Sequence, residues 1–90
     1  MLDLLKKLLV EFAGSLLFLY VIISTGNPLA IVASLYIALL AGGSISGGHF
    51  NPMVSFLMAY SGKIPYKDLG FYILAQILGG FVGYSIYKFM

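Results

Sequence analysis

The polar residues that could bind or orient a small molecule gather around one Asn-Pro pair. Residues 42–61 read GGSISGGHFNPMVSFLMAYS, so a glycine-rich approach ends at Asn51 and Pro52. Asparagine is a favoured N-cap and proline suits the first helical position, which predicts a helix that begins at Asn51. If the Asn51 side-chain oxygen caps this helix, the amide N–H₂ group stays free to donate a hydrogen bond to a passing molecule. The alternative is that Asn51 only caps a buried helix.

The other polar residues do not form a catalytic or metal-binding set. The chain contains one histidine, three acidic residues and no cysteine. This inventory offers no combination of acid, base and nucleophile, and no cluster of metal ligands. His49 is interpreted either as a structural residue or as a lining residue that offers one donor and one acceptor. We therefore expect no enzymatic activity, no cofactor and no metal.

The helix that begins at Asn51 is too short to cross a membrane. Gly62 and Pro65 interrupt the apolar pattern, so the helix extends only to about Ser61. At ~1.5 Å per residue it spans roughly 16 Å, about half of a hydrocarbon core of ~30 Å. A half-length apolar helix after a glycine-rich loop is typical of a re-entrant segment, which protein or a water-filled cavity must surround.

Composition indicates an integral membrane protein. Hydrophobic residues make up 61% of the 90 residues and charged residues only 9%, with a mean hydropathy of +1.03. These values exclude an ordinary soluble domain. We predict one all-α membrane unit over residues 1–90, with spanning helices at about 4–23, 28–43 and 68–88 and a loop and half-helix at 44–61. A cleaved signal peptide is the alternative for the first span, although Glu11 interrupts that apolar region.

The lysines indicate the topology. They are too few and too scattered for a nucleic-acid surface, so no nucleic-acid partner is expected. A cytoplasmic N-terminus places Lys6, Lys7, Lys63 and Lys67 inside and only Lys88 outside, in line with the positive-inside tendency. We predict a multi-pass protein with its N-terminus in the cytoplasm and its C-terminus outside.

Two polar side chains are expected inside the spanning helices. Glu11 lies about one to two turns into the first helix, and we predict that its carboxylate accepts N–H bonds from the glycine loop. The alternative is that it snorkels to the interface. Gln76, near the middle of the third span, either satisfies irregular backbone or joins two helices. Gly79 and Gly83 stand four residues apart and permit close approach of helices.

These motifs resemble those of the aquaporin and aquaglyceroporin family, the major intrinsic proteins. The central stretch is similar to the core signature Ser-Gly-x-His-x-Asn-Pro-Ala of the first family repeat, and it reads Ser46-Gly47-Gly48-His49-Phe50-Asn51-Pro52-Met53. Two further stretches resemble the first-helix and third-helix motifs of the family, Glu11-Phe12-x-Gly14-Ser15 and Ala75-Gln76-x-x-Gly79. The resemblance covers essentially all 90 residues.

The resemblance implies a channel that passes water or small neutral solutes down their gradient. Family members contain two inverted repeats whose Asn-Pro-Ala motifs meet at the bilayer centre, and four such pores usually form a tetramer. The resemblance implies that Asn51 is the central donor and that Pro52 begins the half-helix. It assigns the pore-lining loop to Gly47, Gly48, His49 and Phe50. Glu11 would support this loop, and Gln76 the corresponding loop of the other repeat.

The sequence departs from the family pattern at three places. Met53 replaces the usual Ala where the two motifs touch, so that contact must accommodate a larger and more flexible side chain. Ile31 stands twenty positions before Asn51, at the filter position where water-selective members usually carry Phe and glycerol channels Trp. A second repeat and its filter arginine are missing, and a single repeat would leave its loop and half-helix open to lipid.

The sequence is compatible with two functions. The first is half of a passive channel for water or small uncharged solutes, embedded in a lipid bilayer and closed by a second aquaporin-like half, a partner chain or self-association. Such a chain is either a natural half or a fragment of a longer one. Self-pairing needs two copies in opposite orientations, and the lysine bias argues against that. The second is a non-conducting small membrane protein with a degenerate channel fold, which associates through the face containing Gly79 and Gly83.

Overall fold

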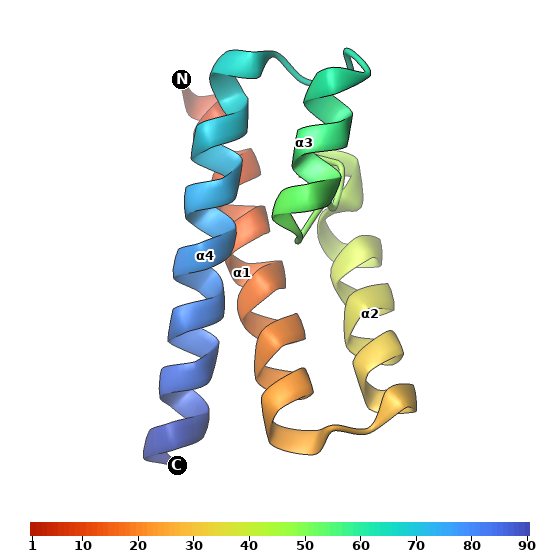
Figure 1. Ribbon diagram of the computed structural model, residues 1–90, viewed down its shortest axis with the longest axis vertical. Coiled ribbons are helices and arrows are strands. Elements are labelled where there is room, and N and C mark those ends of the chain that lie inside the picture. Colours follow the sequence, from red (N-terminus) through yellow and green to blue (C-terminus); the bar gives the residue numbers. More distant parts are fainter.

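Four helices make up the fold. The computed structural model describes all 90 residues, with helices α1 (Leu2–Thr25), α2 (Pro28–Ser46), α3 (Pro52–Tyr60) and α4 (Tyr66–Phe89). By length and composition α1, α2 and α4 can each cross a membrane, which confirms the predicted all-α fold of three spans and one half-length helix. Figure 1 shows α1 between α4 and α2, with α3 beside the upper half of α4. Accordingly, α1 packs against both α2 and α4, and α3 packs against α4.

Asparagine-proline pairs begin two of the helices. Asn27 Oδ1 accepts a hydrogen bond from the Ala30 N–H at 2.9 Å, and Asn51 Oδ1 accepts one from the Met53 N–H at 2.8 Å. A proline follows each cap at the first helical position, where a missing N–H costs nothing. The same local chemistry therefore begins a full-length helix at one end of the molecule and the half-length helix inside it.

The second helix extends further than the sequence predicts. It continues past Gly43 to Ser46 and ends where Gly47 adopts a φ of 93°. Glycines are compatible with a membrane helix where a neighbour packs closely, and a Cβ added at Gly42 would overlap the Val10 side chain. Residues 44–46 are consequently helical, the loop is confined to residues 47–51, and α3 is only nine residues long.

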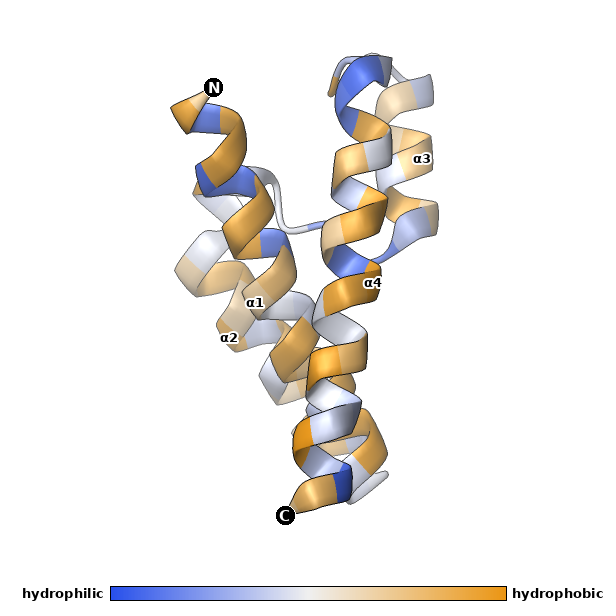
Figure 2. Ribbon diagram, turned by 90° about the vertical axis from the view of Figure 1, so that its left-hand side faces the viewer, coloured by the Kyte–Doolittle hydropathy of each residue, from blue (hydrophilic) through white to orange (hydrophobic).

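Small and polar side chains form the interior. The buried residues of α2 repeat every four positions, at Ser34, Ala38, Gly42 and Ser46. The buried residues of the other helices are Glu11, Gly14, Ser15, Ser55, Ala59, Tyr72, Ala75, Gln76, Gly79 and Gly83. Figure 2 shows hydrophobic residues along all four helices. Large apolar residues face outward because lipid solvates them, while small residues allow the helices to approach closely.

Two glycines bring α4 against α1. A Cβ added at Gly79 would overlap the Phe12 carbonyl oxygen, and one added at Gly83 would lie 2.7 Å from the Leu16 carbonyl oxygen. Both glycines are buried inside the chain. They are therefore used in the packing of α4 on α1. They do not form the external association face that was expected for a non-conducting membrane protein.

The chain termini lie at opposite ends of the molecule. The N-terminus and the α3–α4 connection share one end, and the C-terminus and the α1–α2 turn share the other (Figure 1). Lys6, Lys7, Lys63 and Lys67 consequently belong to one end and Lys88 to the other. This separation is the charge distribution on which the predicted orientation depends.

Candidate functional site

The Glu11 carboxylate lies at the centre of the site. Its Oε2 accepts hydrogen bonds from Ser46 Oγ at 2.7 Å and the His49 N–H at 3.0 Å. Its Oε1 accepts from the Phe50 N–H and from Gln76 Nε2, both at 2.8 Å. The side chain is fully buried, so Glu11 does not snorkel to the interface. A single carboxylate thus replaces the helical carbonyls that the loop N–H groups lack.

The loop that Glu11 holds has an unusual backbone. Gly47 and Gly48 have φ values of 93° and 66°, and Phe50 has a φ of 53°, a region that non-glycine residues rarely adopt. The Phe50 ring packs against α1 at Gly14, where a Cβ would overlap it. The hydrogen bond from the Phe50 N–H to Glu11 and this contact together hold the strained residue in place.

Side chains from α3 and α4 extend the network behind the loop. Gln76 Nε2 also donates to Ser55 Oγ at 2.8 Å, and Ser55 Oγ lies 2.8 Å from His49 Nδ1. The Tyr72 hydroxyl donates to the Ser46 carbonyl oxygen at 2.8 Å. The Tyr72 ring also lies against the His49 imidazole, with 4.9 Å between the centroids. The network therefore connects all four helices through the loop.

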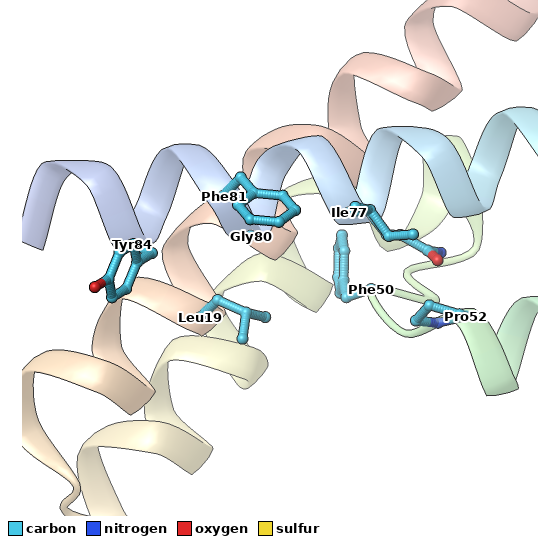
Figure 3. A pocket seen from close by; sticks show the side chains of 8 residues that line it. Leu19, Phe50, Pro52, Ile77, Gly80, Phe81 and Tyr84 are labelled. Atoms are coloured by element: carbon cyan, nitrogen blue, oxygen red, sulfur yellow. The ribbon is translucent and has the colours of Figure 1, made fainter.

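Gln76 retains one polar atom without a partner. Its side chain is 4% exposed, yet its buried Oε1 accepts no hydrogen bond. The residue lines a groove of about 510 Å³, which is otherwise lined by Leu19, Phe50, Pro52, Ile77, Gly80, Phe81 and Tyr84 (Figure 3). Oε1 is therefore the one polar atom of the Gln76 amide that the chain leaves without a partner.

Asn51 presents its amide group on the open side of the loop. Its Oδ1 is occupied by the cap on α3, the residue is exposed, and its N–H₂ group has no partner in the chain. The N-terminus of α3 carries the partial positive charge of the helix dipole. A fixed donor and a positive dipole end therefore coincide, an arrangement that favours a neutral molecule with an accepting oxygen and disfavours cations.

The structure separates the predicted lining residues into two groups. Asn51, Pro52, Met53 and Gly47 are exposed and Gly48 is half-buried, whereas His49 and Phe50 are 6% and 3% exposed. The His49 and Phe50 side chains thus pack largely against the protein, and Phe50 also lines the groove beside α4. Their side chains are turned inward because they hold the loop against Tyr72 and α1.

Ile31 is not part of this cluster. It lies in the first turn of α2, at the end of the molecule away from α3 (Figure 1), and it is half-buried. Since α2 does not pack against α3, nothing within the chain brings Ile31 to Asn51.

Gln76 forms hydrogen bonds within this chain only through its amide nitrogen. Its Nε2 donates to Glu11 on α1 and to Ser55 on α3, in line with the alternative that Gln76 joins two helices. It therefore joins helices through side chains and leaves only Oε1 for an external donor.

Ser55 and Tyr72 are site residues that the sequence reasoning missed. Tyr72 lies one turn before Gln76 and two turns before Gly79 on α4, and the three are buried on one face. Ser55 stands one turn after Asn51 on α3 and is likewise buried. Helical spacing from the residues already singled out is the signal that could have identified both.

The full length of the chain matches a family model. Residues 1–90 match the model described as Major intrinsic protein. The chain belongs to the major intrinsic protein family. Together with its three apolar helices, this membership establishes that it is an integral membrane protein.

Several curated members of the major intrinsic protein family are similar to this chain. A probable glycerol uptake facilitator protein of Thermotoga maritima is 42% identical over 64 residues, which cover 71% of this chain and 26% of the relative. Glycerol uptake facilitator protein-like 6 of Lactiplantibacillus plantarum is 37% identical, covering 92% and 43%. Human aquaporin-9 is 43% identical, covering 68% and 19%. This chain therefore spans less than half the length of these relatives. No solved structure gives a significant match.

Proposed function

We propose that this chain forms one half of a passive channel for water or small uncharged solutes. The observation that carries the proposal is the exposed Asn51 amide at the positive end of α3, whose own oxygen is occupied by the helix cap. A donor in this position binds the oxygen of a neutral molecule, and the dipole repels hydrated cations and protons. The names of the relatives, two glycerol uptake facilitators and an aquaporin, support this class of permeant.

We further propose that a second aquaporin-like half closes the pore. Gln76 Oε1 lies unpartnered beside the groove formed by α1, the loop and α4. A loop N–H from a second half would satisfy this oxygen, and its apolar side chains would fill the groove. That half is either a further part of a longer chain or a separate chain. An identical copy in the opposite orientation is disfavoured by the lysines.

The proposed orientation places the N-terminus in the cytoplasm. Lys6, Lys7, Lys63 and Lys67 belong to the end of the molecule that carries the N-terminus, and Lys88 belongs to the other. Positive residues are enriched on the cytoplasmic side of membrane proteins, so the four lysines support this orientation.

Replacing Asn51 with Asp tests the permeation mechanism. We define the channel chimera as glycerol uptake facilitator protein-like 6 of L. plantarum with this chain in place of its matching segment. Asp is as good an N-cap as Asn, so α3 should persist in Asn51→Asp. A negative charge in place of the amide should attract cations and protons. We expect the ratio of neutral-solute permeability to proton conductance in proteoliposomes to fall by about tenfold or more, which corresponds to ~1.4 kcal/mol.

Asn27→Asp is the matched control. Asn27 caps α2 in the same manner, with Oδ1 accepting from the Ala30 N–H, but it lies at the end of the molecule away from α3. The permeability ratio should be unchanged in this variant. Equal ratios for both variants, with both proteins folded and inserted, would contradict the role proposed for Asn51.

A further inference from the structure

The hydrogen bonds around Gln76 determine the orientation of its amide. One atom of this amide lies 2.8 Å from both Glu11 Oε1 and Ser55 Oγ. A carboxylate only accepts hydrogen bonds, so this atom must be the nitrogen, Nε2. Its two N–H groups then point one to each partner. Ser55 Oγ therefore accepts a hydrogen bond from Gln76.

The orientation of Gln76 determines in turn what Ser55 can donate. Ser55 is fully buried, so its hydroxyl hydrogen cannot be directed to solvent. Besides Gln76, its only hydrogen-bond partner is His49 Nδ1, at 2.8 Å. If Nδ1 carried a hydrogen, Ser55 would receive two donors and its own buried hydroxyl would lack an acceptor. The satisfied arrangement has Ser55 donating to an unprotonated Nδ1, which places the imidazole hydrogen on Nε2.

The other ring nitrogen of His49 is partly accessible beside Gly47. Nε2 has no hydrogen-bond partner in the chain, yet it does not belong to the fully buried polar atoms that lack one. It therefore retains some accessible surface. It lies beside Gly47, where an added Cβ would be 3.0 Å away, and Gly47 is exposed.

We propose that Ser55 is a positioning residue that holds His49 in the Nε2–H tautomer, so that His49 presents a hydrogen-bond donor beside Gly47 to the oxygen of a small neutral molecule. His49 then offers a donor only, because its acceptor nitrogen is occupied by Ser55. The identity of the molecule rests on the proposed channel function. The tautomer and its contact with water follow from this chain alone.

Nitrogen NMR of the labelled chain in bilayers tests the proposal. His49 is the single histidine, so ¹⁵N-histidine labelling gives an unambiguous signal, and a mildly alkaline pH keeps an ordinary imidazole neutral. We expect an unprotonated Nδ1 and a protonated Nε2 in the unmodified chain. We also expect magnetisation transfer from water to the Nε2–H.

Serine substitutions separate positioning from packing. In Ser55→Ala the population of the Nδ1–H tautomer relative to Nε2–H should rise about tenfold or more, corresponding to ~1.4 kcal/mol. Ser55→Thr keeps the hydroxyl and should preserve the Nε2–H form. Ser34→Ala is the matched control, because Ser34 is buried on α2 and donates only to the Ile31 carbonyl. It should leave the tautomer unchanged.

The NMR spectra of the unmodified chain test the tautomer of His49 and its contact with water even if a variant fails to fold. A predominant Nδ1–H tautomer or a doubly protonated ring would overturn the role of Ser55. An Nε2–H without transfer from water would overturn the donor role. If the tautomer and the water contact are as expected but the channel chimera does not conduct, the proposed function and the identity of the molecule fail, while the tautomer assignment stands.

Discussion

Replacing Glu11 with Gln is expected to lower the free energy of unfolding by about 1.5–3 kcal/mol, the contribution of hydrogen bonds to a charged group. Gln has the size of Glu but only one accepting oxygen. Whichever way the amide is oriented, its N–H₂ group faces a backbone N–H that can only donate, that of either His49 or Phe50. The remaining bonds also lose the contribution of the charge.

A detergent titration measures the effect of Glu11→Gln. Unfolding of the purified chain in mixed micelles, followed by circular dichroism, gives the change in free energy. Asp3→Asn is the matched control, since Asp3 is exposed on the same helix and its replacement should change stability by no more than about 0.5 kcal/mol. Equal stabilities for both variants would show that Glu11 does not hold the loop.

Adding one methyl group to α4 should have opposite effects at two glycines. In Gly79→Ala the new Cβ overlaps the Phe12 carbonyl oxygen. Backbone cannot move aside as a flexible side chain can, so α4 must shift away from α1. Gln76 lies one turn before Gly79 and would shift with it, weakening its bond to Glu11. We expect the free energy of unfolding to fall by about 1–3 kcal/mol, the usual cost of overpacking.

Gly70→Ala is the matched control on the same helix. Gly70 is exposed and a Cβ added there meets nothing within 4 Å. Alanine is the better helix former, so this variant should gain about 0.5–1 kcal/mol in the same titration. Changes of the same sign at both positions would contradict the close contact between α1 and α4.

Features determined by neighbouring residues could be predicted from the sequence. The Asn-Pro caps are local, so the starts of α2 and α3 follow from Asn27 and Asn51. The three apolar spans follow from composition in the same way. The sequence also predicted that Glu11 accepts hydrogen bonds from loop N–H groups, with snorkelling as the alternative, and the carboxylate accepts from the His49 and Phe50 N–H groups.

Features determined by distant residues could not be predicted. The sequence predicted that the second helix ends at about Gly43. Instead α2 continues to Ser46, which forms hydrogen bonds with Glu11 and Tyr72. The Phe50 ring is buried against Gly14 of α1, a contact that the sequence did not predict. These outcomes depend on contacts between helices far apart in the sequence, which no local pattern records.

Osmotic shrinkage of proteoliposomes tests the central claim that this chain forms half of a pore. Stopped-flow measurements would compare three proteins: the 90-residue chain alone, the channel chimera and the unmodified L. plantarum relative. We predict shrinkage no faster than bare lipid for the chain alone. For the chimera we predict shrinkage faster than bare lipid, as for the unmodified relative. A folded and inserted chimera that shrinks no faster than bare lipid, beside a conducting relative, would contradict the claim.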